Sequence, residues 1–383
     1  MSFKKTVKAL GLSSGGLDSI LSALVLQKQG IEVEWISMET PFFSSVNAKM
    51  AGKANEIPVI VKDITDEYLV MLKSPKAGYG KNMNPCMDCH ALMFNIAGRV
   101  MEKKGFDFLF SGEVVGQRPM SQNKNSLRYV ERHSGFAGKI LRPLSAKLLP
   151  ETSFEKEGLV DRQQLLNISG RSRKIQMALA KKLGVKEFPA PAGGCRLTDI
   201  GFSGRLRDLF KYEKYYSKND LFLLHHGRHL RLNKDIKIIV GRDQRDNENI
   251  LKYYDADSNV LIKMPDTPGP VVLVTGKKII SLFDSKVVNS KVVDFKLTDF
   301  HSFDIQLLDG VKELDGTLLD SILFDTQLNM INYIKIAIPI CTGYSKLPEG
   351  ATADVQITTP WGGGITKGVG GSVEQFKKFL LHN

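Results

Sequence analysis

The chain has 383 residues, 42% of them hydrophobic and 8% aromatic, and its 53 Lys and Arg outnumber its 41 Asp and Glu by 12. This apolar share supports buried cores and excludes a fully disordered chain, and the length predicts two or three domains. No run of about 18 uncharged apolar residues is present, which excludes a transmembrane helix, and we expect no secretory signal. Four cysteines are too few for a disulfide framework, so we expect the reducing cytoplasm.

The positive charge is concentrated in the first 299 residues. Residues 300–383 hold six Lys and nine Asp or Glu, a net charge of −3, which leaves +15 for the rest of the chain. A basic body favours an anionic partner such as a nucleic acid, a nucleotide or a membrane surface. Solubility alone is the other interpretation of this charge.

Strand and helix patterns alternate over the first 150 residues. Strands are expected at 6–13, 31–37, 58–61, 106–110 and 139–144, and helices at 19–29 and 91–104. This alternation predicts an α/β fold with a doubly wound parallel sheet. Beyond residue 200, short β-like runs at 235–240, 260–264 and 271–275 predict a smaller α+β region, and 359–371 reads as a glycine-rich loop.

A helical pattern over 161–184, broken at Gly170, carries charge on one side. Ile175, Leu179 and Leu183 recur every four residues as an apolar stripe. The bases on the other side are Arg171, Lys174, Lys181 and Lys182. They are either a solvated face or contacts for the phosphate backbone of RNA.

The segment Ser14-Gly15-Gly16-Leu17-Asp18-Ser19 joins the first strand to the first helix. Glycines allow a tight turn whose N–H groups converge, and the helix dipole favours an anion at that point. Asp18 would repel a phosphate unless a cation lies between them, so we assign it to Mg²⁺ or to polarising the reaction. The segment is neither a Walker A loop nor a dinucleotide fingerprint, because the glycine spacing differs.

The pattern SGGLDS after a strand resembles the PP-loop of ATP pyrophosphatases. Those enzymes cleave ATP between the α and β phosphates and adenylate a substrate oxygen. The resemblance implies an adenine nucleotide alpha hydrolase-like fold, ATP with Mg²⁺, and nucleotide contacts from Ser14, Gly15, Gly16, Asp18 and Ser19. Met38, at the end of the second strand, is where such folds meet adenine, although a core methionine is the other interpretation.

Three of the four cysteines have a spacing that suggests chemistry. Cys86 and Cys89 form a Cys-x-x-Cys pair, and Cys195 follows two glycines. Three thiolates could hold a 4Fe–4S cluster with one open iron, and a fourth ligand, Cys341 or His90, would instead close a zinc site. A persulfide carried by one cysteine and resolved by another needs no metal, and inert buried thiols are the remaining option. We favour the cluster, and expect Cys341, in a β-like run over 337–341, to be structural.

The flanking segments resemble tRNA thiouridine synthetases. Phe110 to Arg118, which includes Gly112 and Gln117, and Leu141 to Leu144 are similar to motifs of the 4-thiouridine synthetases, and the three cysteines are similar to those of 2-thiouridylases and their cluster-containing relatives. The resemblance covers about residues 5–200. It implies an ATP-dependent tRNA-uridine sulfurtransferase, with Gly112 and Gln117 at the nucleotide. The implied partners are tRNA and a sulfur donor, either sulfide or a cysteine desulfurase relay, with no membrane.

Two departures leave the modified uridine open. We expect no N-terminal RNA-binding extension, since the loop begins at residue 14, and the C-terminal region does not resemble the β-barrel of 2-thiouridylases. The oligomeric state is also open, a homodimer being one option.

Residues 225–300 resemble the NFACT RNA-binding domain, through a Gly-Arg segment at Gly241 and a Pro-Gly-Pro turn at Pro268. Arg242 and Arg245 lie in its basic stretch and are candidates for RNA contact, although a turn-rich structural module is the other interpretation. We therefore divide the chain into a catalytic domain at 1–200, a linker at 201–224, the NFACT-like module at 225–300 and an acidic region of unknown role at 301–383.

The expected reaction has two steps. A uridine carbonyl oxygen attacks the α-phosphate of ATP, and sulfur from Cys86, Cys89 or Cys195, on a cluster or as a persulfide, then displaces AMP; Asp18 and these cysteines are the catalytic candidates. An amide-forming PP-loop enzyme and a non-catalytic RNA-binding factor are the competing functions.

Overall fold

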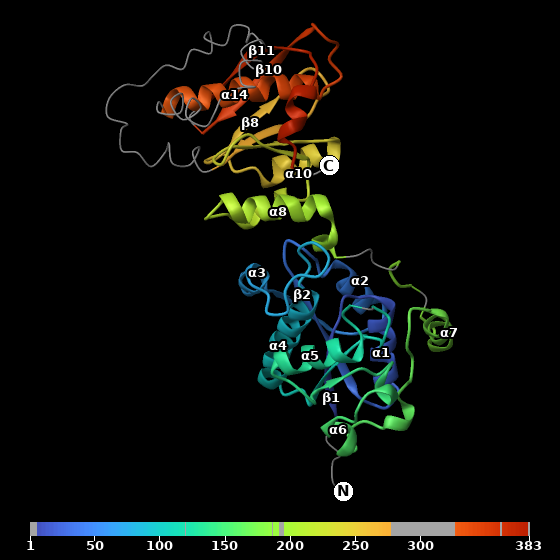
Figure 1. The fold of residues 1–383 in the computed structure, drawn as a ribbon. Helices are drawn as coiled ribbons and strands as arrows, with labels where there is room; N and C mark the ends of the chain where they lie inside the picture. The colour runs from blue at the N-terminus through green and yellow to red at the C-terminus, as the bar shows by residue number, and fades with distance from the viewer. Residues whose placement is uncertain are drawn as a thin grey trace. The chain divides into compact units, whose positions relative to one another are not determined.

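The computed structural model describes residues 6–118, 120–185, 187–190, 195–276, 326–360 and 362–381. The chain forms two compact units, Met1–Asp199 and Ile200–Asn383 (Figure 1). None of the helices within the described ranges combines the length and apolar character that a membrane span requires.

The first unit is built on a five-stranded parallel sheet with the order β3-β2-β1-β4-β5. The strands are β1 (Lys8–Leu12), β2 (Glu32–Glu39), β3 (Val59–Asp63), β4 (Phe108–Ser111) and β5 (Ile140–Leu141). Ala9 of β1 lies opposite Val33 and Phe108 in the register. The predicted doubly wound parallel sheet is confirmed, and the strand order reverses beside β1, where such sheets bind ligands.

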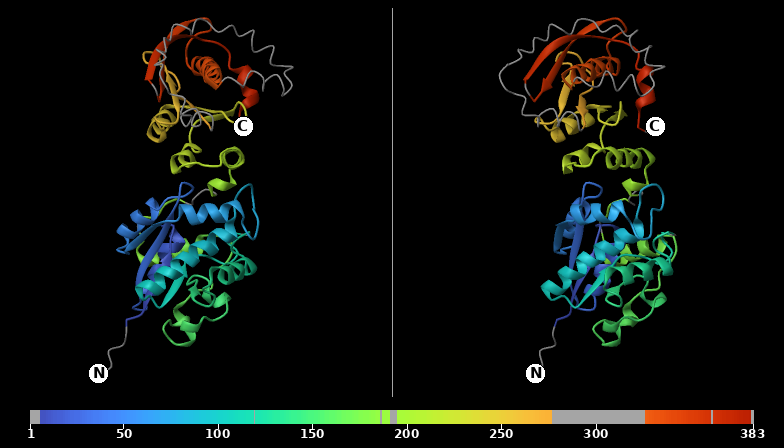
Figure 2. Two further views of the ribbon diagram at one scale, coloured as in Figure 1. Left: turned by 90° about the vertical axis from the view of Figure 1, so that its left-hand side faces the viewer. Right: turned by 60° about the vertical axis from the view of Figure 1, so that its left-hand side comes forward.

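Helices cover both faces of this sheet (Figures 1 and 2). They are α1 (Leu17–Gln27), α2 (Val46–Ala54), α3 (Thr65–Lys73), α4 (Cys86–Lys104), α5 (Lys124–Ser134), α6 (Ser153–Lys156) and α7 (Lys174–Leu183), with short 3-10 turns at Ala146–Leu148, Arg162–Gln164 and Arg196–Thr198. On one face, α1 and α7 pack together over a core that includes the fully buried Trp35 and Phe108. On the other, α4 packs against β1, β4 and α5.

The apolar stripe predicted on α7 is only partly buried. Leu179 and Leu183 pack against the core of the first unit, but the Ile175 side chain is 59% exposed. The predicted helix over 161–184 is also shorter than expected, because only the 3-10 turn Arg162–Gln164 precedes α7. Ile175 lies on the first turn of α7, where it does not reach the core.

The second unit has a six-stranded antiparallel sheet with the order β11-β10-β8-β9-β7-β6. Its strands are β6 (Arg228–Arg231), β7 (Lys237–Val240), β8 (Val260–Lys263), β9 (Val272–Thr275), β10 (Thr352–Thr359) and β11 (Gly362–Val369). Its helices are α8 (Ile200–Tyr212), α9 (Lys218–Leu223), α10 (Gln244–Tyr253) and α14 (Thr326–Gly343), with a 3-10 turn at Glu374–Phe379.

The expected boundaries of the C-terminal half differ from the structure. The segment 201–224, expected as a linker, holds α8 and α9, because Phe202, Leu206 and Leu209 are buried. The described part of 301–383, expected as a separate acidic region, contributes β10, β11 and α14 to the same sheet and core as 225–276. Residues 277–325 of these two predicted regions lie outside the described residues.

Two local predictions were wrong. Cys341, expected in a β-like run, lies in α14, because Ile334, Ala337, Ile338 and Cys341 recur at helical spacing and are all buried. The glycine-rich stretch expected as a loop forms β11, where a Cβ on Gly368 would lie 2.7 Å from the Thr342 and Val355 side chains. Glycine at this position therefore allows the strand to pack closely against α14.

Cys341 provides a test of its structural role. Its side chain is fully buried, and the thiol lies 3.6 Å from the carbonyl oxygen of Pro270. We expect Cys341→Ala to lower the free energy of unfolding by about 1 kcal/mol through a small cavity, measured by chemical denaturation. ATP binding should be unchanged, and a loss of ATP binding at full stability would contradict a structural role.

Candidate active site

The loop between β1 and α1 is held in shape by backbone contacts. The Ser13 amide donates to the carbonyl oxygen of Ile36 at 3.0 Å, and the Ser13 hydroxyl accepts from the Gly15 amide at 3.0 Å. Gly15 has a φ of +76°, and a Cβ there would lie 2.3 Å from the carbonyl oxygen of Asn47. A side chain at position 15 is therefore excluded by conformation and by space.

The outer side of the same loop is open. A Cβ on Gly16 would meet only the Ser14 hydroxyl, at 3.7 Å, and Ser14 itself is exposed. Gly112, which follows β4, lies against the first turn of α1, because a Cβ there would be 2.5 Å from the Ser19 amide nitrogen. The loop thus offers a phosphate an open approach to the first N–H groups of a helix, and these residues fit the phosphates of ATP.

Asp18, in the first turn of α1, is contacted by two side chains. The Gln117 amide donates to Asp18 Oδ2 at 3.0 Å, and Nη2 of Arg173 lies 3.7 Å from the same oxygen. Asp18 Oδ1 and Arg173 Nε are both buried and have no hydrogen-bond partner among the described residues. Gln117 was predicted at the nucleotide, but Arg173 was missed, because no sequence signal separates it from the basic residues beside it.

The other predicted nucleotide contacts lie close to the loop in sequence or at the same edge of the sheet. Ser19 is buried on the first turn of α1, and Met38 is buried in β2 with 4% of its surface exposed. Burial of Met38 is consistent both with contact to adenine and with a core methionine.

Three cysteines gather in the first unit. Cys86 begins α4, Cys89 follows within the same turn, and Cys195 directly precedes the turn Arg196–Thr198. That turn is tied to the chain ahead of α4, because the Asn82 amide donates to the carbonyl oxygen of Thr198 at 2.7 Å. Burial is the main cause of the raised pKa values of Cys89 and Cys195, and the charge of Cys86 raises both further.

Cys86 ends a chain of buried polar contacts. Its thiol is hydrogen-bonded to His90, whose Nδ1 lies 2.8 Å from Glu113 Oε1, and Arg142 Nε donates to Glu113 Oε2 at 2.9 Å. Burial opposes ionisation of Cys86, but His90 outweighs it and lowers the pKa of this thiol to about 7. Burial likewise opposes the charge of Glu113, but Arg142 and His90 lower its pKa to about 2.

Cys89 and Cys195 have different surroundings. Burial raises the pKa of Cys89 far above its usual range, although the side chain is hydrogen-bonded to the buried Tyr68. Burial also raises the pKa of Cys195. Cys86 is therefore the one of these three thiols whose pKa is lowered overall, which favours its thiolate.

In the described structure, two of the three cysteines have side-chain hydrogen-bond partners. Cys86 is hydrogen-bonded to His90, and Cys89 is hydrogen-bonded to Tyr68. Across the parts of the chain that the structure describes, no group of three or more Cys, His, Asp or Glu is placed to hold a metal ion.

The predicted RNA contacts fall into two groups, one in each unit. Arg171, Lys174, Lys181 and Lys182 are exposed on α7 and just before it. In the second unit Arg245 is exposed on α10, whereas Arg242 forms an ion pair with Asp246 at 2.5 Å.

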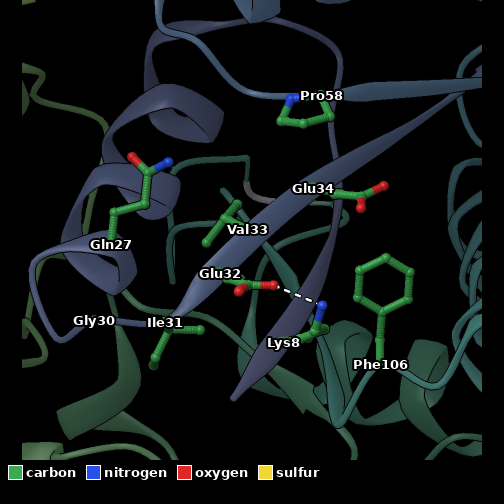
Figure 3. Close-up of a pocket in the computed structure, with 9 residues that line it drawn as sticks. All are labelled: Lys8, Gln27, Gly30, Ile31, Glu32, Val33, Glu34, Pro58 and Phe106. Atoms are coloured by element: carbon green, nitrogen blue, oxygen red, sulfur yellow. Dashed lines mark ion pairs between the residues drawn. The ribbon is translucent and has the colours of Figure 1, made fainter. Parts of the chain in front are cut away.

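A cavity of about 520 Å³ lies at the opposite end of the strands (Figure 3). It is lined by residues at the starts of β1 and β2, and Lys8 Nζ lies 2.7 Å from Glu32 Oε2 across it. None of the predicted site residues lines this cavity, and ligands of open parallel sheets bind at the carboxyl ends of the strands instead.

The parallel sheet with a glycine loop ahead of α1 defines an α/β nucleotide-binding domain of the PP-loop class. Residues 5–148 match the family model described as thiamine biosynthesis protein (ThiI), and residues 227–282 match the NFACT protein RNA binding domain. The chain therefore joins a ThiI-type PP-loop domain to an NFACT-type RNA-binding domain, as the sequence resemblance implied.

Curated relatives match the first of these domains. The chain is 30% identical over 205 residues to the tRNA-specific 2-thiouridylase MnmA of Endomicrobium trichonymphae, covering 47% of this chain and 56% of the relative. It is 30% identical over 146 residues to a probable tRNA sulfurtransferase of Thermoanaerobacter sp. (strain X514), covering 36% of each. The matches thus span from about a third to somewhat more than half of these relatives.

A solved structure of a 4-thiouridine synthetase in complex with RNA and ATP is 19% identical and covers 47% of this chain and 52% of that chain, with a TM-score of 0.30. That score is too low to carry an inference about this chain.

The glycine loop provides a matched pair of variants. We expect Gly15→Ala to destabilise the first unit by about 1–3 kcal/mol, because the residue is held at positive φ against backbone. Gly16→Ala should leave stability unchanged but weaken ATP binding at least tenfold, because its methyl group enters the open side of the loop. Denaturation and nucleotide titration measure the two effects, and tight ATP binding by Gly16→Ala would contradict the assigned phosphate position.

Proposed function

We propose that the chain is an ATP-dependent tRNA-uridine sulfurtransferase. The observation that carries the proposal is the segment 112–117 after β4, which contacts both halves of the site. Gly112 and Gln117 contact the first turn of α1, and Glu113 holds His90 beside Cys86. A nucleotide on the loop and a sulfur atom on Cys86 would therefore act on one substrate.

In the first step, the glycine loop and Ser19 bind the phosphates of ATP, and Asp18 holds Mg²⁺, which offsets their charge. A carbonyl oxygen of a tRNA uridine attacks the α-phosphorus, and the bond to the β-phosphate oxygen breaks. Pyrophosphate leaves, and the uridine oxygen becomes part of an AMP ester, a far better leaving group. N–H donors at the helix start stabilise the charge that develops on the phosphate.

In the second step, a persulfide on Cys86 supplies the sulfur. Its terminal sulfur attacks the activated carbon, the carbon–oxygen bond breaks and AMP leaves. The thiol of Cys89 or Cys195 then attacks Cys86 Sγ, which forms a protein disulfide and leaves the sulfur on the nucleoside. A dithiol reductant restores the two thiols, and a cysteine desulfurase relay reloads Cys86 by transferring the outer sulfur of its own persulfide. Sulfide as the donor would instead attack Cys86 Sγ in the protein disulfide, which forms the Cys86 persulfide and releases the other cysteine as a thiol.

The 4Fe–4S cluster on Cys86, Cys89 and Cys195 stays a second candidate for the sulfur carrier. The presence of three cysteines in the first unit supports the cluster. The hydrogen bonds of Cys86 with His90 and of Cys89 with Tyr68 support the persulfide. Anaerobically purified protein that is brown, with about four irons per chain lost on Cys86→Ala, would favour the cluster. Colourless active protein with sulfur trapped on Cys86 would favour the persulfide.

The proposed nucleic-acid partner is tRNA, bound in the cytoplasm and without a membrane. The NFACT-type domain and the exposed bases Arg245, Lys174 and Lys181 support this assignment. Phe222 and Tyr253 of the second unit stack with their ring centres 4.8 Å apart, and both are partly exposed, so we propose them as candidates for stacking on unpaired bases. Mass spectrometry of tRNA, described below, identifies the modified uridine, and a homodimer is one candidate for the assembly state.

The first test separates the two steps. Asp18→Asn should abolish pyrophosphate release in the presence of tRNA, by about 100-fold or more, while tRNA binding stays within twofold. Cys86→Ser should retain pyrophosphate release and lose thiolation. Wild-type thiolation by Cys86→Ser would refute sulfur transfer from this residue.

The second test identifies the product. Mass spectrometry of tRNA nucleosides from cells that lack this gene should show the loss of one thiolated uridine, which assigns the position. An unchanged thiouridine set would contradict the proposed function and revive the amide-forming or RNA-binding alternatives.

A further inference from the structure

We propose that Arg173 binds the phosphate chain of ATP and completes the site around the glycine loop. The inference rests on the proposed use of ATP. Arg173 lies outside residues 5–148, the stretch that matches the ThiI family model, and its neighbours were assigned to RNA. It reaches the loop through Asp18, whose Oδ2 lies 3.7 Å from the guanidinium Nη2.

The backbone ahead of Arg173 is fixed beside the segment that follows β4. The Gly170 amide donates to the carbonyl oxygen of Val115 at 2.8 Å, and Ser169 forms a parallel β-bridge with Val115. Ser145 joins the same two segments, because its hydroxyl donates to the carbonyl oxygen of Ile168 at 2.6 Å and accepts from the Val115 amide at 3.0 Å. These contacts place Arg173 at the carboxyl ends of the parallel strands, where ligands of such folds bind.

The contacts of Arg173 leave most of its hydrogen-bonding capacity unused. A guanidinium carries five N–H donors in a planar fork that suits phosphate oxygens. The Nη2 separation from Asp18 is longer than a hydrogen bond, and the buried Nε has no partner among the described residues. Gln117 already donates to Asp18 Oδ2, which is the same oxygen that Arg173 approaches.

The charges at the loop explain why a cation is needed at this point. Asp18 stands in the first turn of α1, where its charge repels the phosphates that the loop attracts. Arg173 adds a positive charge beside Asp18 to that of the proposed Mg²⁺, which reduces the repulsion between Asp18 and the phosphates.

Arg173 is less exposed than the basic residues that were assigned to RNA contact. The side chain of Arg173 is 27% exposed, whereas those of the nearby Arg171 and Lys174 lie open to solvent. A residue held against the glycine loop is placed for the nucleotide rather than for the phosphate backbone of a large nucleic acid.

The test measures ATP and tRNA binding by the full chain. We expect Arg173→Gln to weaken ATP binding at least tenfold and pyrophosphate binding in parallel, with tRNA binding within twofold of wild type. Arg173→Lys, which keeps the charge but loses the fork, should lose less ATP affinity than Arg173→Gln. Arg132→Gln on α5, an exposed arginine with no assigned role, is the matched control and should bind ATP as wild type does.

Equal ATP affinity for wild type and Arg173→Gln would overturn the inference, as would loss of tRNA binding with ATP binding retained. Arg173→Lys provides the comparison if Arg173→Gln fails to fold, and full ATP affinity in a folded Arg173→Lys would then refute the need for the fork. Failure of the wild type itself to bind ATP would instead refute the proposed function.

Discussion

The buried carboxylate of Glu113 is the interaction on which the rest of the candidate site depends. It is 6% exposed and stays charged because Arg142, itself 1% exposed, and His90 both contact it. Removing one partner from such a group leaves an unpaired buried charge, which costs about 3–5 kcal/mol. Glu113, in the segment after β4, fixes the ring of His90 and therefore its contact with Cys86. Four residues later in the same segment, Gln117 fixes the side chain of Asp18. One short segment thus sets the geometry of the loop and of the cysteine helix together.

Much of the first unit could be predicted because its signals are local. Apolar runs separated by helical patterns indicate a parallel sheet, and SGGLDS between a strand and a helix indicates a phosphate site. The position of Arg173 beside Asp18 could not be predicted, because it depends on Ser145 and Val115 holding a segment distant in sequence. The meeting of Cys195 with Cys86 likewise depends on tertiary contacts such as that from Asn82 to Thr198.

The errors in the second unit arose from ambiguous patterns. The run around Cys341 is short, apolar and interrupted by Pro339, and periodicity alone does not distinguish a buried strand from a buried helix in such a run. Glycines at 362–371 suggested a loop, because the close approach of α14 that they permit is visible only in the folded chain. The acidic composition of 300–383 described its surface and carried no information about where its apolar residues pack.

The sheet of the second unit draws on two separate stretches of sequence. β10 pairs with β8 on one side and with β11 on the other, and α14 packs against β8 and β9. A fragment cut to the limits of the RNA-binding match, residues 227–282, would therefore expose Val260, Ile262 and Val274, whose burial depends on residues after 326. Transfer of this module to another protein would therefore require residues 326–381 together with residues 227–276.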